Sequence, residues 1–272
     1  MRSWAAFFLL LLLLFHVWGC ALQTEESKQP IKSLDDISDK AIESISRKTI
    51  FFGHASVGYN IVQGMKEIME LDPRFKKINI IEIKENANIK GPGLYHSVNG
   101  KNSYPKTKCD SFEIFLIKRR FGEFVDVGLF KFCYVDIEKD SNVQEIFDYY
   151  VRTIENIKME YPKLKIIHVT APLYAHAFGL KGFVKSMIKA DMSNIKRNQF
   201  NELLKNKYAG VDPIYDLARV EYEKRNGEVS KFFYNGKMYH SLAEEYTNDG
   251  GHLNEIGRFR AAKEFIRVLS TI

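Results

Sequence analysis

The sequence has few cysteines and no long run of charge of one sign. Only three cysteines occur among 272 residues, which excludes the dense disulfide framework that stabilises many small secreted domains. The net charge of +6 is spread along the chain, and its densest point is the KRR run at residues 118–120. No basic block with interleaved aromatic side chains occurs. Nucleic acid is therefore not expected as a partner.

Long apolar runs are also missing, with one exception near the N-terminus. Residues 5–15 (AAFFLLLLLLF) follow Arg2 and carry no charge. This run is too short to span a bilayer comfortably, which takes about 20 residues, but it is typical of a signal peptide. It ends in HVWGC, where Gly19 before Cys20 resembles the lipobox of bacterial lipoproteins.

We therefore expect residues 1–19 to be a signal peptide and Cys20 to carry a lipid that anchors an exported protein to the bacterial cell envelope. The alternative is a plain secretory signal. Residues 20–33 are polar and contain a proline, as expected of a flexible tether, and residues 34–272 form the folded domain. For Cys109 and Cys133 there are two alternatives: they form a disulfide after export, or they remain buried free thiols.

From residue 34 onward, apolar strand-like segments alternate with helical ones. The first helix is short, with Ser33 as its N-cap. The expected strands are residues 48–52, 78–83, 126–135, 164–173 and 211–217. The expected helices are residues 60–71, 111–121, 142–161, 194–208 and 254–270, with a long loop over residues 86–108. This pattern predicts a single three-layer α/β/α domain around a mostly parallel, about five-stranded, flavodoxin-like sheet.

Ser56 follows the first expected strand, in the sequence FFGHASVG. In parallel α/β sheets, ligands bind outside the carboxyl ends of the strands. A serine there lies at the N-terminus of a helix, where backbone N–H groups and the helix dipole favour a developing negative charge. Gly53 and Gly58 allow a tight backbone path. The alternative is that Ser56 only caps the helix.

The sequence NDGGHLNEIG, which precedes the last expected helix, places Asp249 three residues before His252. A nucleophilic serine needs a base, and the base needs an acceptor that sets its tautomer. A short glycine loop lets the Asp249 carboxylate fold back onto the His252 ring. The alternative is that Asp249 caps the helix and His252 is an exposed first-turn residue.

Together these two segments resemble the SGNH (GDSL-type) hydrolase family, over residues 48–272 by the order of the elements. The resemblance implies that Ser56 is the nucleophile, His252 the general base and acid, and Asp249 the carboxylate that orients it. It also matches Gly100, in HSVNGKN, to the glycine of the family's second block.

The sequence departs from the family at two places. The usual Gly-Asp-Ser is GHAS here, so His54 and Ala55 precede the serine. The family's Gly-x-Asn-Asp after the third strand is absent, and an ionised Asp136 cannot donate to an oxyanion. Asn102 is a candidate donor near Gly100; the alternative is that NGKN is only a glycine turn. His54 is expected to line the pocket or cap the turn.

Other functions compete with ester hydrolysis. His54, Asp249 and His252 would make a two-histidine, one-carboxylate metal site, but they match a hydrolase pattern better than any metal spacing, so neither metal nor cofactor is expected. An α/β-hydrolase is disfavoured because its Gly-x-Ser-x-Gly elbow is missing. We expect a serine esterase acting on an extracytoplasmic acetylated glycan or lipid ester. The alternatives are an acyltransferase with the same triad, or a surface carbohydrate-binding protein on a degenerate hydrolase scaffold.

Overall fold

A six-stranded parallel sheet lies at the centre of the unit Leu34–Ile272. The computed structural model describes residues 33–84, 88–176 and 183–272, and in helix α5 the side chains from residue 191 onward. The strands are β1 (Thr49–His54), β2 (Ile80–Glu82), β3 (Gly93–Val98), β4 (Val127–Phe130), β5 (Lys165–Val169) and β6 (Ile214–Tyr215). Their order is β2-β3-β1-β4-β5-β6, and every pair is parallel.

Strand β1 is the centre of this sheet because it pairs with β3 on one side and with β4 on the other. All six of its residues are buried. Alternate side chains enter opposite cores: Ile50 and Phe52 belong to one apolar cluster, and Phe51 belongs to the other. Burial on both faces explains the continuous apolar run in the sequence.

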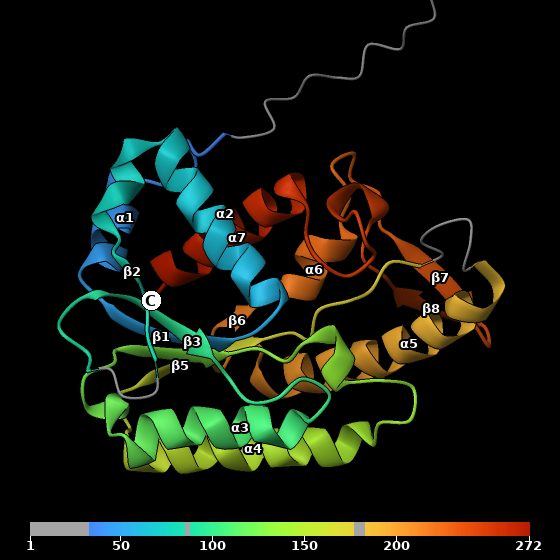
Figure 1. Ribbon diagram of the computed structural model, residues 1–272, viewed down its shortest axis with the longest axis horizontal. Coiled ribbons are helices and arrows are strands. Elements are labelled where there is room, and N and C mark those ends of the chain that lie inside the picture. Colours follow the sequence, from blue (N-terminus) through green and yellow to red (C-terminus); the bar gives the residue numbers. More distant parts are fainter. Residues whose placement is uncertain (1–32, 85–87, 177–182) are drawn as a thin grey trace, which may run out of the picture. The chain divides into compact units, whose positions relative to one another are not determined.

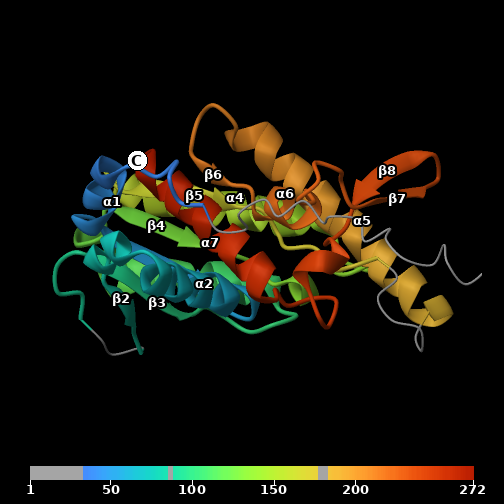
Figure 2. The ribbon, with the colours of Figure 1, turned by 90° about the horizontal axis from the view of Figure 1, so that it is seen from above.

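Helices cover both faces of the sheet, so the predicted three-layer α/β/α fold is confirmed (Figure 1). The helices are α1 (Asp39–Ser46), α2 (Val57–Leu71), α3 (Pro105–Glu113), α4 (Val143–Glu160), α5 (Phe183–Tyr208), α6 (Leu217–Tyr222) and α7 (Glu255–Ser270). Helices α1, α2 and α7 pack on one face, and α3, α4 and α5 pack on the other. Figure 2 views the unit from the side of α2 and α7.

The sheet has six strands where about five were expected, because β3 lies inside the segment expected to be a loop. Its sequence, GLYHSV, contains two polar residues, yet five of its six residues are buried between β1 and β2. The segment 78–83, expected to be the second strand, contributes only the edge strand β2. The remaining five strands, β3-β1-β4-β5-β6, have the flavodoxin-like order that was predicted.

Several boundaries also differ from the prediction. Ser38, and not Ser33, caps α1, and its side chain accepts from the Ala41 N–H. Helix α2 begins at Val57, directly after Ser56. Helix α3 begins at Pro105 and continues through a π-helical turn, Ile114–Lys118.

An antiparallel hairpin, β7 (Lys231–Tyr234) and β8 (Lys237–His240), was not predicted. Its turn residues, Asn235 and Gly236, both have positive φ. Asn-Gly between apolar segments is a strong hairpin signal that the sequence carried.

The N-terminal predictions fall on residues that the structure does not describe. The signal peptide (residues 1–19), Cys20 and all but the last residue of the tether lie outside the described ranges. In the part of the chain that is described, no helix is long and apolar enough to cross a membrane.

Candidate active site

Ser56 lies between the end of β1 and the start of α2, and its side chain does not cap the helix. Its Oγ lies 2.8 Å from Nε2 of His252, which is 196 residues further along the chain. Its backbone has φ 52° and ψ −113°, a conformation that costs a non-glycine residue about 1–3 kcal/mol. Strain of this kind is frequent at functional sites. Because the Ser56 side chain makes no capping hydrogen bond, the capping alternative is wrong.

The neighbouring glycines make the sharp turn around Ser56 possible. A Cβ atom on Gly58 would lie 2.3 Å from Cβ of His54. On Gly53 it would lie 2.9 Å from the side chain of Asn99. Both distances are shorter than real contacts, so larger residues would push α2 or the loop after β3 away from β1.

Asp249 and His252 form a compact turn before α7. Oδ2 of Asp249 lies 2.7 Å from Nδ1 of His252, and Oδ1 accepts from the N–H groups of His252 and Gly251. Because the carboxylate only accepts, Nδ1 carries the proton and Nε2 is left to accept from the Ser56 hydroxyl. Asn254, and not Asp249, caps α7, so the capping alternative for Asp249 is also wrong.

Two tyrosine rings pack so closely against this turn that its two middle residues must be glycine. A Cβ on Gly250 would lie 2.9 Å from the ring of Tyr174, and one on Gly251 would lie 2.8 Å from the ring of Tyr134. The Tyr134 ring also makes an edge contact with His252, at 5.9 Å between centroids. The rings thus pack against the histidine turn from the segments that follow β4 and β5.

A hydrogen bond joins the two ends of the site directly. The Leu253 N–H donates to Oδ1 of Asn60 at 3.1 Å. Asn60 lies in the first turn of α2, so the segment that carries His252 is tied to the helix that follows Ser56.

The electrostatics favour an ionised Asp249. Partial burial by itself raises the pKa of this carboxyl, but hydrogen bonds from the His252 and Gly251 N–H groups and from the His252 ring outweigh it and lower the pKa to about 2. The side chains of Asp249 and His252 are 57% and 45% exposed. The pair is therefore accessible to water and to a substrate at the surface.

The sequence placed Gly100 and Asn102 near the oxyanion, and both lie in the loop between β3 and α3. Gly100 has φ 63°, and a Cβ there would lie 2.5 Å from the Thr107 carbonyl oxygen, so glycine is required. Asn102 is exposed, and its Oδ1 accepts from Nζ of Lys108 at 2.9 Å. The Asn99 N–H bonds to the His54 carbonyl, which ties the start of this loop to the end of β1.

His54 does not line a pocket, contrary to the expectation. It is fully buried, and its Nε2 lies 3.1 Å from Nδ1 of His96, a buried residue of β3. Burial, with the nearby charges of His96, Lys131 and Lys108, lowers the pKa of His54 to about 2, so it is neutral. His54 therefore does not join Asp249 and His252 in a metal site. No cluster of metal-ligating side chains occurs within the described ranges.

Asp136 links the loop after β3 to the segment after β4. Its carboxylate accepts from the backbone N–H groups of Ser103 (2.8 Å) and Cys133 (2.6 Å). The Cys133 thiol in turn contacts the carbonyl oxygen of Ala55, the residue before Ser56, at 3.6 Å. Cys133 and Cys109 are both buried free thiols, so they do not pair.

Two fully buried lysines, Lys108 and Lys131, were missed by the sequence interpretation. Nζ of Lys131 donates to the Phe132 carbonyl and lies 3.7 Å from Sγ of Cys133. A lysine inside the apolar segment that follows β4 was the available signal, because lysine is almost never fully buried without a partner.

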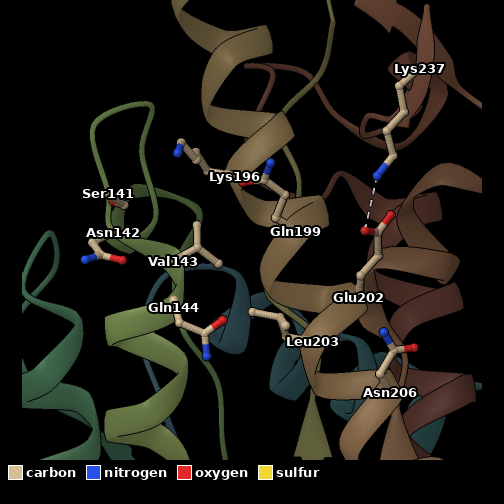
Figure 3. Close-up of a pocket in the computed structure, with 10 residues that line it drawn as sticks. All are labelled: Ser141, Asn142, Val143, Gln144, Lys196, Gln199, Glu202, Leu203, Asn206 and Lys237. Atoms are coloured by element: carbon tan, nitrogen blue, oxygen red, sulfur yellow. Dashed lines mark hydrogen bonds and ion pairs between the residues drawn. The ribbon is translucent and has the colours of Figure 1, made fainter.

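A polar hollow lies elsewhere, between the start of α4 and α5 (Figure 3). It has a volume of about 490 Å³. It is lined by Ser141, Asn142, Val143, Gln144, Lys196, Gln199, Glu202, Leu203, Asn206 and Lys237. None of these is Ser56, Asp249 or His252, so the serine site does not open into this hollow.

The geometry thus defines a class of site: a serine, a histidine and a carboxylate linked in series at the carboxyl end of a parallel α/β sheet. Ser56 follows β1, between β3 and β4, where the order of the strands reverses. Ligands of open α/β sheets bind at this position.

Comparison with known proteins agrees at the level of the fold. No protein-family model and no curated protein matches the sequence. A GDSL-like lipase from Bacteroides thetaiotaomicron has 13% sequence identity and a TM-score of 0.52, over 83% of this chain and 89% of that chain. A lipase/acylhydrolase from Enterococcus faecalis has 12% identity and a TM-score of 0.49, over 82% and 96%. The similarity to the Bacteroides thetaiotaomicron protein shows that this chain has the fold of that GDSL-like lipase.

Proposed function

We propose that this protein is a serine ester hydrolase in which Ser56 is the nucleophile. The observation that carries the proposal is the continuous hydrogen-bonded series from Ser56 Oγ through His252 to Asp249, with distances of 2.8 Å and 2.7 Å. The strained backbone of Ser56 supports it further, because strain without a capping role indicates a functional constraint.

The mechanism follows from the tautomer of His252. Nε2 accepts the Ser56 proton as Oγ attacks the ester carbonyl, and Asp249 stabilises the imidazolium that forms. The backbone N–H groups of Ser56 and Gly100 donate to the oxyanion. The imidazolium then protonates the leaving alcohol. Water, activated by His252, hydrolyses the acyl-enzyme and releases the acid.

The substrate class follows from the expected location. With a signal peptide over residues 1–19 and a lipid on Cys20, the domain would lie outside the cytoplasm at the cell envelope. Esters available there are acetylated glycans and lipid esters, and similarity in fold to a GDSL-like lipase supports an ester. The mass of the mature N-terminal peptide tests the lipid on Cys20.

The same triad also serves acyl transfer, in which a sugar hydroxyl replaces water. The exposure of His252 and Asp249 favours hydrolysis, because water reaches the base freely. A carbohydrate-binding protein without catalysis would have no need of a strained serine hydrogen-bonded to a histidine.

The deciding experiment compares turnover of small aryl esters by the wild-type protein and the Ser56→Ala variant. We expect activity to fall by about 10³-fold or more, because the acyl-enzyme no longer forms. Ser141→Ala is a matched control, since Ser141 lines the hollow of Figure 3 and lies outside the triad. Equal turnover by wild type and Ser56→Ala would refute the nucleophile. An inactive wild type would favour acyl transfer or binding.

A further inference from the structure

Lys108 is a fully buried lysine beside the candidate oxyanion site. It lies in the first turn of α3, and its Nζ donates to Oδ1 of Asn102 at 2.9 Å. Burying an ammonium group costs several kcal/mol unless hydrogen bonds and nearby charges offset this cost. The hydrogen bond from Lys108 to the exposed Asn102 therefore suggests that Lys108 serves to position the Asn102 side chain.

The contact fixes the orientation of the Asn102 carboxamide. An asparagine side chain has an accepting oxygen and a donating NH₂ group, and the ammonium group of a lysine can only donate. Oδ1 must therefore face Lys108, and the NH₂ group must face the opposite way. Oδ1 is thus bonded to Lys108, and only the NH₂ group is left to donate to another acceptor.

The backbone on both sides of Asn102 is tied to the strand ends that flank Ser56. On one side, the Asn99 N–H donates to the His54 carbonyl at 2.9 Å. On the other side, the Ser103 N–H donates to Asp136, which also accepts from Cys133. The loop that carries Asn102 is thus hydrogen-bonded at one end to the last residue of β1 and at the other end to the segment that follows β4.

We propose that Asn102 donates a hydrogen bond from Nδ2 to the oxyanion, and that Lys108 is the positioning residue that orients it. The proposal rests on the ester hydrolysis proposed above. It accounts for the missing Gly-x-Asn-Asp after β4, since the loop there supplies Asp136, which has no proton to donate when ionised. In this chain the amide donor comes from the loop after β3.

Asn102→Asp separates donation from positioning. A carboxylate still accepts from Lys108, but it cannot donate to the oxyanion. We expect kcat on an aryl ester to fall by about 10²-fold, the usual effect of removing one oxyanion donor, while KM changes by less than about threefold. Wild-type kcat in Asn102→Asp, with Ser56→Ala inactive, would overturn this proposal and leave the proposed function intact.

Lys108→Met tests positioning through a double-mutant cycle. The substitution keeps a long side chain and removes the donor, so we expect kcat to fall by about tenfold or more in the wild-type background. In the Asn102→Ala background the same substitution is expected to change kcat by less than about twofold. An equal loss in both backgrounds would mean that Lys108 acts only on the general fold, and would overturn its positioning role.

Lys106→Met is the matched control, because Lys106 lies in the same helix but pairs with Glu145 at the surface. It is expected to retain wild-type kcat. If Lys108→Met does not fold, Lys108→Arg provides the second variant, since it preserves a donor and is expected to keep more activity than Asn102→Asp. Activity of Lys108→Arg at or below that of Asn102→Asp would contradict the proposal.

Discussion

At the scale of single residues, the site depends on which hydrogen bond each polar group makes. Ser56 and Asp249 both precede a helix, so each could have been its N-cap. Instead, Ser56 bonds to His252, and Asn254 caps α7 in place of Asp249. The low pKa of Asp249, about 2, follows from three hydrogen bonds to its carboxylate, which outweigh its partial burial. The carboxylate is therefore charged at neutral and mildly acidic pH.

Asp249→Asn is expected to lower kcat by about 10²- to 10⁴-fold, because a neutral amide neither stabilises the imidazolium nor enforces the correct tautomer. In the wild type, Asp249 stays ionised at neutral and mildly acidic pH, because its pKa is about 2. Steady-state kinetics of the two proteins measure the effect of the substitution. Retention of wild-type kcat by Asp249→Asn would contradict the assigned role.

At the scale of elements, α2 and α7 bring the two halves of the site together. Ser56 directly precedes α2, and the turn with His252 precedes α7. The helices approach closely at Gly64, where a Cβ would lie 2.3 Å from the Arg258 carbonyl oxygen. Nearby, Arg258 bonds to Glu67 across the same interface at 2.8 Å.

Gly64→Ala tests this interface with a clear sign. Helix propensity alone would make the substitution stabilising by about 1 kcal/mol. Because the added methyl group overlaps the backbone of α7, we expect instead a loss of about 1–3 kcal/mol in the free energy of unfolding. Urea denaturation measures it, with Gln63→Ala at an exposed position of α2 as the control. An increase in stability would show that the helices separate without cost.

At the scale of the whole molecule, two ionisable groups, Arg197 and Glu221, are buried in the fold. Arg197 is buried in α5 and donates from Nε to the Tyr134 carbonyl oxygen at 2.7 Å. Glu221 is buried in α6, and Oε2 accepts from the Leu173 N–H at 2.6 Å. Burial raises the pKa of Glu221 to about 8, although Lys131 and Arg197 lower it in part. The folded protein therefore holds this carboxyl in its protonated form at neutral pH.

This raised pKa makes stability depend on pH. Between about pH 4.5 and pH 8, Glu221 ionises in the unfolded chain but stays protonated in the fold, so the free energy of unfolding decreases as pH rises. Glu221→Gln keeps the acceptor for Leu173 and removes the titration. Its stability relative to wild type should rise by roughly 2 to 5 kcal/mol from pH 5 to pH 8. Urea denaturation measures this, with exposed Glu244→Gln as the control, and parallel pH profiles would contradict it.

Much of the fold was predictable, because its signals are local. The apolar residues of β1, β4 and β5 and the periodicity of α2, α4 and α7 are visible in short windows of sequence. Strand β3 was missed for the opposite reason. GLYHSV has little strand character by itself, and it becomes a strand because β1 and β2 supply its hydrogen-bonding partners.

The sequence by itself determined the parallel α/β class and singled out Ser56, Asp249 and His252, since each stands in a short motif whose chemistry depends on near neighbours. Only the tertiary structure decided how these motifs meet, and the same holds for the buried pair of His54 and His96 and for the contact between Lys108 and Asn102. The physical reason is that burial and side-chain pairing depend on which strand ends and loops become neighbours. His54 and His96 are 42 residues apart, and no local pattern relates them.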